Sequence, residues 1–401
     1  MSLAANPGTA TFYVGNNPGV KLMLNWRNLI YMLSVQLVLI CVVGNMAFAR
    51  AESAIEATFD KRGIKLESGF PDHSESLWRV FNESLSKDLE LGVSVSFFAG
   101  AYLNLDADIV ELNLHDAISA CARGEINLLP YHQILPDNMD LADYVWNGLQ
   151  PCAVGHSVWA DLITYDSTLF LNKPEPVSFE DFFNIEDFPG KRAIKKTPRA
   201  LAEWSLMLDG VRRQDVYSAL TGDDAWSQVE IALELLDQQI LWVDHDHEAL
   251  ELLDQGHASF ALVSSQNLVR RIEERKKSEL PYNHYEVIWS EAIAHMNMLA
   301  VPKKRQLPVR SGPQEKTLEF LRYVMDPYRN LQLSTTLGYA PVSRLHTGFI
   351  DETYRAVIPI DTQLDSLFWS NDKWWREAGY EIEVKFRQYL ARSYLLKVAE
   401  F

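Results

Sequence analysis

Cysteine is scarce in this 401-residue sequence, which contains only three, and none of them belongs to a CxxC pair. The sequence also lacks an HExxH segment, a GxSxG elbow and a P-loop, which mark common metalloprotease, hydrolase and nucleotide-binding sites. Scattered carboxylates such as Asp161 and Glu291 could serve as an acid–base pair only if the fold brought them together. Nothing in the sequence therefore indicates an enzyme, and we expect neither a cofactor nor a metal ion.

Acidic residues are absent from the first 51 positions. In this stretch Lys21 and Arg27 precede an apolar run, Leu29–Val43, and small-x-small sequences then end at Ala49 and Ala51. That layout is typical of a secretory signal peptide. The apolar run is shorter than the roughly 20 residues that a membrane-spanning helix needs, although an uncleaved N-terminal anchor is the alternative. We therefore predict cleavage after Ala49 or Ala51 and a periplasmic product.

Loss of this leader would make the chain more acidic. It would remove Lys21, Arg27 and Arg50 but no acid, so the formal charge would change from −17 to −17 − 3 = −20. Because nucleic-acid binding requires a basic surface, we predict no nucleic-acid partner. Cys121 and Cys152 would remain. In an oxidising compartment they could form a disulfide, but a pair of cysteines does not by itself show that their geometry permits the bond.

Apolar segments alternate with amphipathic segments after the leader. The pattern predicts strands over 64–68, 93–98 and 108–112, and an amphipathic helix over 74–89. Strands that alternate with helices form βαβ units and a mainly parallel sheet, so we predict an α/β fold. Ligands of such sheets lie beyond the carboxyl ends of the strands. This rule selects Gly69, Phe70, Ala99–Tyr102 and Asn113.

Two long extended segments, Val158–Tyr165 and His295–Val301, are suited to crossing from one lobe of a protein to another. They divide the chain into two groups of βα units, so we expect two lobes with a cleft between them. The expected division is a signal peptide with an N-terminal extension at 1–51, a first lobe from 52–164 plus 296–401, and a second lobe from 165–295.

The segment FPGKRAIKKTPRALAEWSLMLDG, residues 188–210, is expected to join a strand to a helix. Lys191–Lys196 has an extended pattern after the Pro-Gly turn, while Thr197 and Pro198 are typical of an N-cap and a first helical position. The helix is expected to end at Gly210. Free backbone N–H groups at such a helix start can bind a ligand. An ordinary βα unit with solvated lysines is the alternative.

The run Asp244-His245-Asp246-His247-Glu248 follows a predicted strand. Its side chains are potential metal ligands, but acidic residues before and within a first helical turn also stabilise the helix dipole. We favour helix capping, because adjacent residues rarely converge on one ion, and we expect Trp242 and Asp244 to face the cleft. The aromatic pairs Phe368-Trp369 and Trp374-Trp375 are expected to pack within a lobe.

Four segments occur in a fixed order along the predicted mature chain: FPGKRAIKK (188–196) with LDGV after its helix, ELLDQGHASFALVSSQN (251–267), MNMLAVPKK (296–304) and TLEFLRYVMDPYRNLQLSTTLGYAPVS (317–343). Their sequences and order resemble the type II periplasmic solute-binding proteins, in particular the spermidine/putrescine-type branch of ABC transporter substrate-binding proteins. The resemblance covers nearly all of the predicted mature chain.

The resemblance implies a two-lobed α/β protein with the periplasmic-binding-protein type II fold, in which each lobe is a mainly parallel sheet flanked by helices. A small solute is held in the hinged cleft, and the closed form docks on an ABC permease with its ATPase in the inner membrane. We expect a monomeric receptor without enzymatic activity. A binding protein that feeds a sensor or chemoreceptor on the same fold is the alternative function.

The residues that hold amines in polyamine receptors are mostly replaced in this sequence. The resemblance places Thr197 and Ala200 where those receptors carry an Asp and a Glu, and His295 and Asn297 where their return strand carries Trp-x-Asp. Tyr339 in the GYAP turn is retained. The segments that define the fold therefore match the polyamine receptors better than the residues at their amine-binding positions do.

Charged residues of both signs are expected near the cleft. Lys195, Lys196 and Arg199 favour a carboxylate or phosphate on the solute, whereas Asp161 and Asp244 are candidates for holding an amine. A small polar solute, polyamine-like or amino-acid-like, would use both sets. The predicted ligand-binding residues are Phe70, Tyr102, Trp159, Asp161, Thr197, Arg199, Trp242, Asp244, Ser265, His295, Asn297 and Tyr339.

Overall fold

The computed structural model describes residues 9–12, 22–25, 64–68, 83, 93–97, 106–137, 139–282, 284–304, 314–360 and 362–399. The chain divides into two units, Met1–Gly63 and Ile64–Phe401. In the first unit, β1 (Thr9–Phe12) and β2 (Leu22–Asn25) pair antiparallel. Within these ranges, no helix has the length and apolar character needed to cross a membrane. The apolar run of the leader, Phe70, Tyr102 and, apart from Glu83, the helix expected at 74–89 lie outside the described residues.

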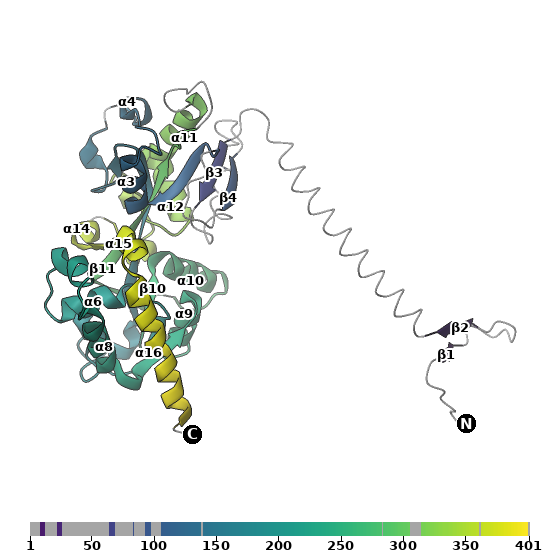
Figure 1. The fold of residues 1–401 in the computed structure, drawn as a ribbon, viewed down its shortest axis with the longest axis vertical. Coiled ribbons are helices and arrows are strands. Elements are labelled where there is room, and N and C mark those ends of the chain that lie inside the picture. Colours follow the sequence, from purple (N-terminus) through teal and green to yellow (C-terminus); the bar gives the residue numbers. More distant parts are fainter. Residues whose placement is uncertain are drawn as a thin grey trace. The chain divides into compact units, whose positions relative to one another are not determined.

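The second unit is built on one mixed sheet. Its strands are β3 (Ile64–Ser68), β4 (Val93–Phe97), β5 (Ile109–Asn113), β6 (Leu149–Gln150), β7 (Ala153–Asp166), β8 (Arg192–Lys195), β9 (Ile240–Val243), β10 (Phe260–Ser264), β11 (Tyr285–Ala300) and β12 (Phe368–Trp369). They are ordered β4-β3-β5-β11-β7-β10-β8-β9, with β12 beside β11 and β6 beside β7. Figure 1 shows β3 and β4 side by side in one lobe and β10 in the other. The outer strands pair in parallel, β3 with β4 and β5 in one lobe and β8 with β9 and β10 in the other.

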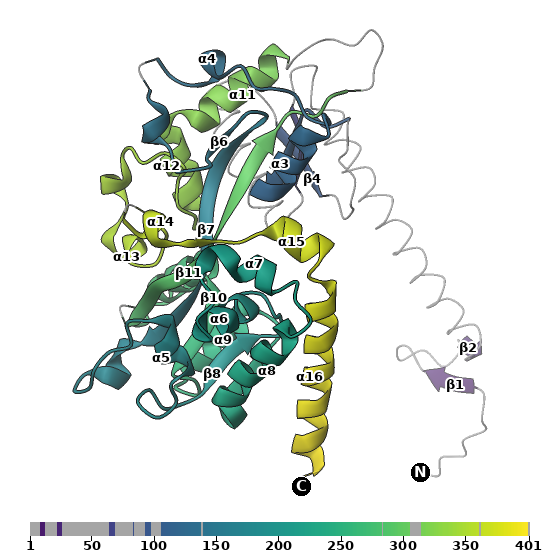
Figure 2. The ribbon, with the colours of Figure 1, turned by 60° about the vertical axis from the view of Figure 1, so that its left-hand side comes forward.

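The two long strands β7 and β11 join the lobes (Figure 2). They pair antiparallel from Tyr285 opposite Asp166 to Ala300 opposite Ala153. The pairing is interrupted by a bulge between Ile288 and Ile293, where Glu291 has a positive φ of 56°. Both expected crossing segments are therefore strands, and the return strand is longer than the sequence predicts because its first half pairs with the second-lobe end of β7.

Helices cover both lobes. They are α3 (Leu114–Ala122), α4 (Tyr131–Ile134), α5 (Phe179–Phe183), α6 (Leu201–Leu208), α7 (Val216–Ala219), α8 (Ala225–Leu236), α9 (Asp246–Asp254), α10 (Ser265–Lys277), α11 (Glu315–Met325), α12 (Pro327–Thr336), α13 (Glu352–Arg355), α14 (Thr362–Ser366), α15 (Asp372–Glu377) and α16 (Tyr380–Ala399). Figure 2 shows α3, α11 and α12 on the lobe that contains β4, α5–α9 on the lobe that contains β8 and β10, and α15 at the junction; Figure 1 shows α10 on the second of these lobes.

The C-terminal helix packs on the second lobe. Phe386 of α16 meets Trp242 of β9 edge-on with ring centroids 5.4 Å apart, and Tyr389 packs on Trp226 of α8. A break separates α15 from α16 at Gly379, where a Cβ would lie 2.6 Å from the carbonyl oxygen of Trp375. The division expected from the sequence places residues 296–401, which include α16, in the first lobe. The lobe boundaries stay a prediction.

The helix after β8 begins later than the sequence predicts. α6 starts at Leu201, after Ala200 in a left-handed conformation with φ 65°. The hydroxyl of Thr197 accepts from the backbone N–H of Arg199 at 3.3 Å, so Thr197 closes a short turn and does not cap the helix. Gly210, with φ 86°, ends the helix as expected.

A fully buried arginine holds the turn before β8. The guanidinium of Arg192 donates to the carbonyls of Phe182 (2.9 Å), Phe188 (2.7 Å), Gly190 (2.5 Å) and Asn184 (3.5 Å). It also lies over the ring of Phe260, 4.7 Å from the centroid. Burial lowers the pKa of Arg192 to about 10. The loop of the FPGKR segment is thus fixed to the sheet by one side chain.

Arg192→Lys is expected to lower the free energy of unfolding by about 3 kcal/mol, because one ammonium cannot satisfy four diverging carbonyls and each buried acceptor left unpaired costs about 1–3 kcal/mol. Urea unfolding followed by circular dichroism measures this change. Arg212→Lys, at an exposed surface ion pair with Asp215, is the matched control and should change stability by less than about 1 kcal/mol. Equal effects of the two substitutions would contradict this role of Arg192.

Cys121 of α3 and Cys152, immediately before β7, form a disulfide that closes a separation of 31 residues. The sequence leaves open whether these two cysteines pair, and in the structure they do. Replacing both cysteines with Ser should lower the free energy of unfolding by about 3–4 kcal/mol, since the bond restricts the unfolded chain. Urea unfolding of the double variant and of the oxidised protein measures this difference. Identical midpoints would contradict the assignment.

Candidate functional site

A cavity of about 610 Å³ lies where strand ends of both lobes meet. Asn113, Lys195 and Ser264 line it, and they are the last residues of β5, β8 and β10. The crossing strands contribute Trp159 and Asp161 from β7 and His295, Met296 and Asn297 from β11. The position agrees with the general rule for α/β sheets, in which ligands lie beyond the carboxyl ends of the strands.

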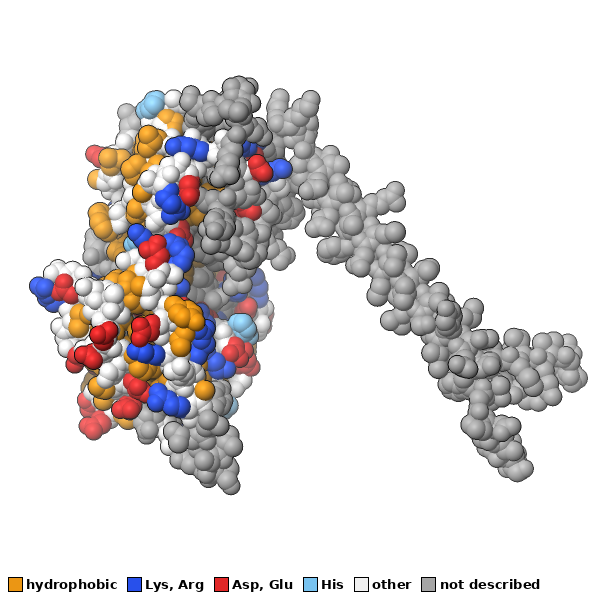
Figure 3. Space-filling model, viewed as in Figure 1, with side chains coloured by type: hydrophobic (Ala, Val, Ile, Leu, Met, Phe, Trp, Pro, Cys, Tyr) orange, Lys and Arg blue, Asp and Glu red, His pale blue; other side chains and the backbone are white. Residues whose placement is uncertain are grey.

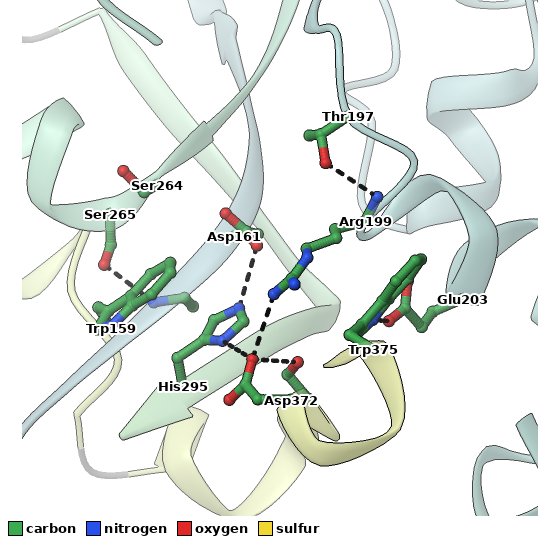
Figure 4. A network of polar contacts seen from close by, with 12 residues as sticks. Trp159, Asp161, Thr197, Arg199, Glu203, Ser264, Ser265, His295, Asp372 and Trp375 are labelled. Atoms are coloured by element: carbon green, nitrogen blue, oxygen red, sulfur yellow. Dashed lines mark hydrogen bonds and ion pairs between the residues drawn. The ribbon is translucent and has the colours of Figure 1, made fainter. Parts of the chain in front are cut away.

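His295 is held between two carboxylates in this cavity. Its Nε2 lies 3.1 Å from Oδ2 of Asp161, and its Nδ1 lies 3.8 Å from Oδ1 of Asp372. Figure 4 shows the imidazole between them. Asp372 reaches this place because β12 pairs with β11 and the N–H of Ser370 donates to the carbonyl of Ala294 at 2.9 Å.

The two carboxylates keep His295 charged. Burial alone would lower its pKa, but the hydrogen bonds and charges of Asp161 and Asp372 outweigh burial and raise the pKa of His295 to about 9. Burial would raise the pKa of Asp372, yet His295 and Arg199 hold it below its usual value. The group is therefore an imidazolium between two carboxylates at neutral pH.

Arg199 is supported by an aromatic face and a carboxylate. Its guanidinium lies 5.3 Å from the ring centroid of Trp375 and 3.5 Å from Asp372. The indole N–H of Trp375 donates to Glu203 at 2.6 Å, and the hydroxyl of Tyr217 donates to the same oxygen at 3.0 Å. Burial raises the pKa of the Glu203 carboxyl, against the effect of these bonds. Trp375 is thereby fixed as a flat support for the guanidinium (Figure 4).

Two buried polar atoms in the cavity wall have no partner among the described residues. Trp159 stacks on His295 at 3.9 Å, and its indole N–H donates to Oδ1 of Asn297 at 3.3 Å. Because an indole N–H can only donate, this contact fixes the amide orientation of Asn297 and leaves Nδ2 as the unpaired donor. Oε1 of Gln266 is an unpaired acceptor. Such groups are normally satisfied by water or a ligand.

The charges of the cavity wall balance. A second ion pair joins Lys195 to Asp246 at 3.1 Å, and Asp246 also accepts from the N–H and hydroxyl of Ser264. Burial would raise the pKa of Asp246, but Lys195 and these hydrogen bonds lower it. The wall holds four carboxylates and, with His295 protonated, four cations: Asp161, Asp246, Asp372 and Glu383 against Lys195, Arg199, His295 and Arg376. The face in Figure 3 likewise intersperses acidic and basic side chains.

The structure brings part of the predicted set together. Six of the predicted residues line the cavity: Trp159, Asp161, Thr197, Arg199, His295 and Asn297. Four others are not among its lining residues. Trp242 packs on Phe386, Asp244 is 64% exposed and pairs with Lys196, Ser265 accepts from the N–H of Ala160 at 3.1 Å, and Tyr339 is buried in the turn after α12.

Sequence reasoning did not select Asp246, Gln266, Asp372 or Trp375 as ligand-binding residues. Asp246 lines the cavity instead of Asp244 because it starts α9 two residues later and points back to β10. Trp375 does pack as expected, with 2% exposure, but one side of it also lines the cavity. No local signal marks Asp372. Among the described residues, no group of three His, Cys, Asp or Glu side chains could hold a metal ion.

Residues 99–344, more than half of the chain, match the family described as bacterial extracellular solute-binding protein. The chain belongs to this family. The family assignment made from the order of segments is thus confirmed, and the protein is an extracellular solute-binding protein.

Known relatives of this solute-binding protein agree with that assignment. A gamma-aminobutyric acid-binding protein of Pseudomonas aeruginosa is 24% identical over 289 residues, 71% of this chain and 76% of that protein. The solved Atu4243 GABA receptor has a TM-score of 0.60 and 19% identity, covering 81% of this chain and 96% of its own. The spermidine/putrescine ABC transporter substrate-binding protein PotD of Streptococcus pneumoniae has a TM-score of 0.61 and 12% identity, covering 82% and 99%. The predicted two-lobed α/β fold is confirmed.

The stability of this solute-binding protein should depend on pH through His295. Its pKa is raised from 6.5 to about 9 in the folded state, so the stabilisation is fully present below pH 6.5 and is lost as pH rises through about 9. The free energy of unfolding of the wild type should therefore approach that of His295→Gln between about pH 7 and 10. Urea unfolding of both proteins across this range measures the difference. A difference that stays constant with pH would contradict a charged His295.

Proposed function

We propose that the protein binds a small zwitterionic, amino-acid-like solute in the periplasm and delivers it to an ABC importer. The observation that carries the proposal is the cavity wall, which combines balanced charges with an unpaired donor on Asn297 and an unpaired acceptor on Gln266. A solute with one carboxylate and one ammonium group satisfies both kinds of group, whereas a dication or a dianion leaves charge uncompensated in a partly desolvated site.

The carboxylate end of the solute is assigned to Arg199. Its guanidinium makes one contact with Asp372 and the side chain is 40% exposed, so further N–H groups are available for a bidentate bond. Trp375 holds it in place from one side. The unpaired N–H of Asn297 adds a neutral donor for the same kind of group.

The ammonium end is assigned to Asp161 and Gln266. Asp161 uses Oδ2 for His295, which leaves its second oxygen for a ligand donor. Oε1 of Gln266 is a buried acceptor that gains a partner when an amine binds. The name of the Pseudomonas aeruginosa relative, a gamma-aminobutyric acid-binding protein, supports a solute of this class.

The exported protein would work with a permease and its ATPase as a monomeric receptor, without catalysing a reaction. The substrate-binding role of PotD in an ABC transporter supports this partner. A sensory role on the same fold predicts instead a kinase or chemoreceptor as the protein that the closed form contacts. Uptake of labelled solute and the cellular response to the solute would be measured in cells that lack the permease. An import receptor supports neither in such cells, whereas a sensor still produces the response.

Three four-carbon solutes test the charge of the ligand. Protein purified from the periplasm is titrated calorimetrically with 4-aminobutanoate, putrescine and succinate, which share chain length and differ in their end groups. We expect 4-aminobutanoate to bind most tightly. Putrescine or succinate binding more tightly than the zwitterion would overturn the proposal.

Arg199→Gln tests the carboxylate end. It should weaken binding of 4-aminobutanoate by roughly 30- to 4,000-fold, which corresponds to the loss of one partner in a desolvated charge pair. Arg212→Gln removes an exposed arginine remote from the lining residues and is the matched control. Unchanged affinity in a folded Arg199→Gln protein would remove Arg199 from the site.

A further inference from the structure

We propose that His295 determines which solutes the cavity accepts, because its imidazolium is a built-in cation that takes the place of a second ammonium group between Asp161 and Asp372. The inference deepens the proposed function, since it explains why a site on a polyamine-receptor scaffold would select one ammonium group and not two. It concerns Asp161 and Asp372, which approach the ring from two different segments of the chain.

The contacts of the His295 ring hold it between Asp161 and Asp372. Each ring nitrogen of His295 faces one carboxylate oxygen, at 3.1 Å for Asp161 and 3.8 Å for Asp372. Trp159 covers one face of the ring, with planes inclined by 14° and centroids 3.9 Å apart. The side chain is 8% exposed. The imidazole occupies Oδ2 of Asp161 and Oδ1 of Asp372, which a second ammonium group would need, while the other oxygen of Asp161 stays available for the first.

The formal charges around the His295 ring indicate that the cavity selects against a second ammonium group on the solute. Asp161 from β7, Asp372 from α15 and His115 from α3 act on His295, and Arg199 from the loop before α6 acts on Asp372. Burial lowers the pKa of His115, which makes it the neutral member. The two carboxylates and Arg199 together carry one negative charge, which the imidazolium cancels. Removing that cation leaves one negative charge free for a second ammonium.

Substitution of His295 tests this role in the full exported protein. His295→Gln should increase affinity for putrescine by about 10- to 100-fold, because Asp372 and Asp161 then lack the imidazolium and can pair with a second ammonium group. His295→Lys keeps a built-in cation and should bind putrescine as weakly as the wild type. His245→Gln, at an exposed histidine outside the lining residues, is the matched control and should leave both affinities unchanged.

The outcomes separate this inference from the proposed function. If the wild type binds 4-aminobutanoate but His295→Gln gains no putrescine affinity, the inference fails and the proposed function stands. If the wild type prefers another solute while His295→Gln gains putrescine, the proposed function fails and the inference stands. An equal gain in His295→Lys would show that space, and not charge, is limiting, and would overturn the inference.

Nitrogen-15 NMR of the wild type provides a measurement that needs no variant. With histidine labelled on both ring nitrogens, His295 should show the shifts of an imidazolium at neutral pH, before and after addition of 4-aminobutanoate. A neutral tautomer in either state would overturn the role of His295 as a built-in cation, even if the substituted proteins failed to fold.

Discussion

The antiparallel pairing of β7 with β11 is the constraint on which the cavity depends. The register places His295 directly opposite Trp159, which brings their rings into a stack at 3.9 Å. Asp161 pairs with Ile293 and so lies on the diagonal from His295, within reach of its imidazole. A shift of one residue would turn these side chains to the other face of the sheet. Strand register therefore decides which charges meet.

Local pattern predicted the frame of this site because strands and crossing segments are continuous in sequence. Trp159 and Asp161 lie on one extended crossing segment, and His295 and Asn297 lie on the other at positions that the family resemblance selects. The pairing of β7 with β11 brings the four together. Asp372 and Trp375 were not found, because β12 carries them to the cavity through a two-residue pairing with a distant strand. Thr197 was misassigned as a helix cap because its hydroxyl binds the N–H of Arg199 two residues on, a competing local contact.

The charges around this cavity are paired by segments that lie far apart in the sequence. Arg199, in the loop before α6, pairs with Asp372 of α15. Arg376, also on α15, pairs with Asp116 of α3 in the other lobe. Glu203 fixes Trp375 from α6. The short helix α15 is thus bonded on both sides of the cavity. Glu203 and Trp375 are buried members of this network, whereas Arg199 and Arg376 are 40% and 42% exposed, so the contact between Glu203 and Trp375 contributes most to holding one arrangement.

The disulfide between Cys121 and Cys152 has a mechanical consequence for any movement of the lobes. It ties the start of β7 to α3, the helix whose N-cap, Asn113, also lines the cavity. The root of the crossing strand therefore cannot slide along the wall of its own lobe. Any relative motion of the lobes would therefore have to bend the strand pair β7–β11 beyond this anchor, with the disulfide as a covalently fixed point.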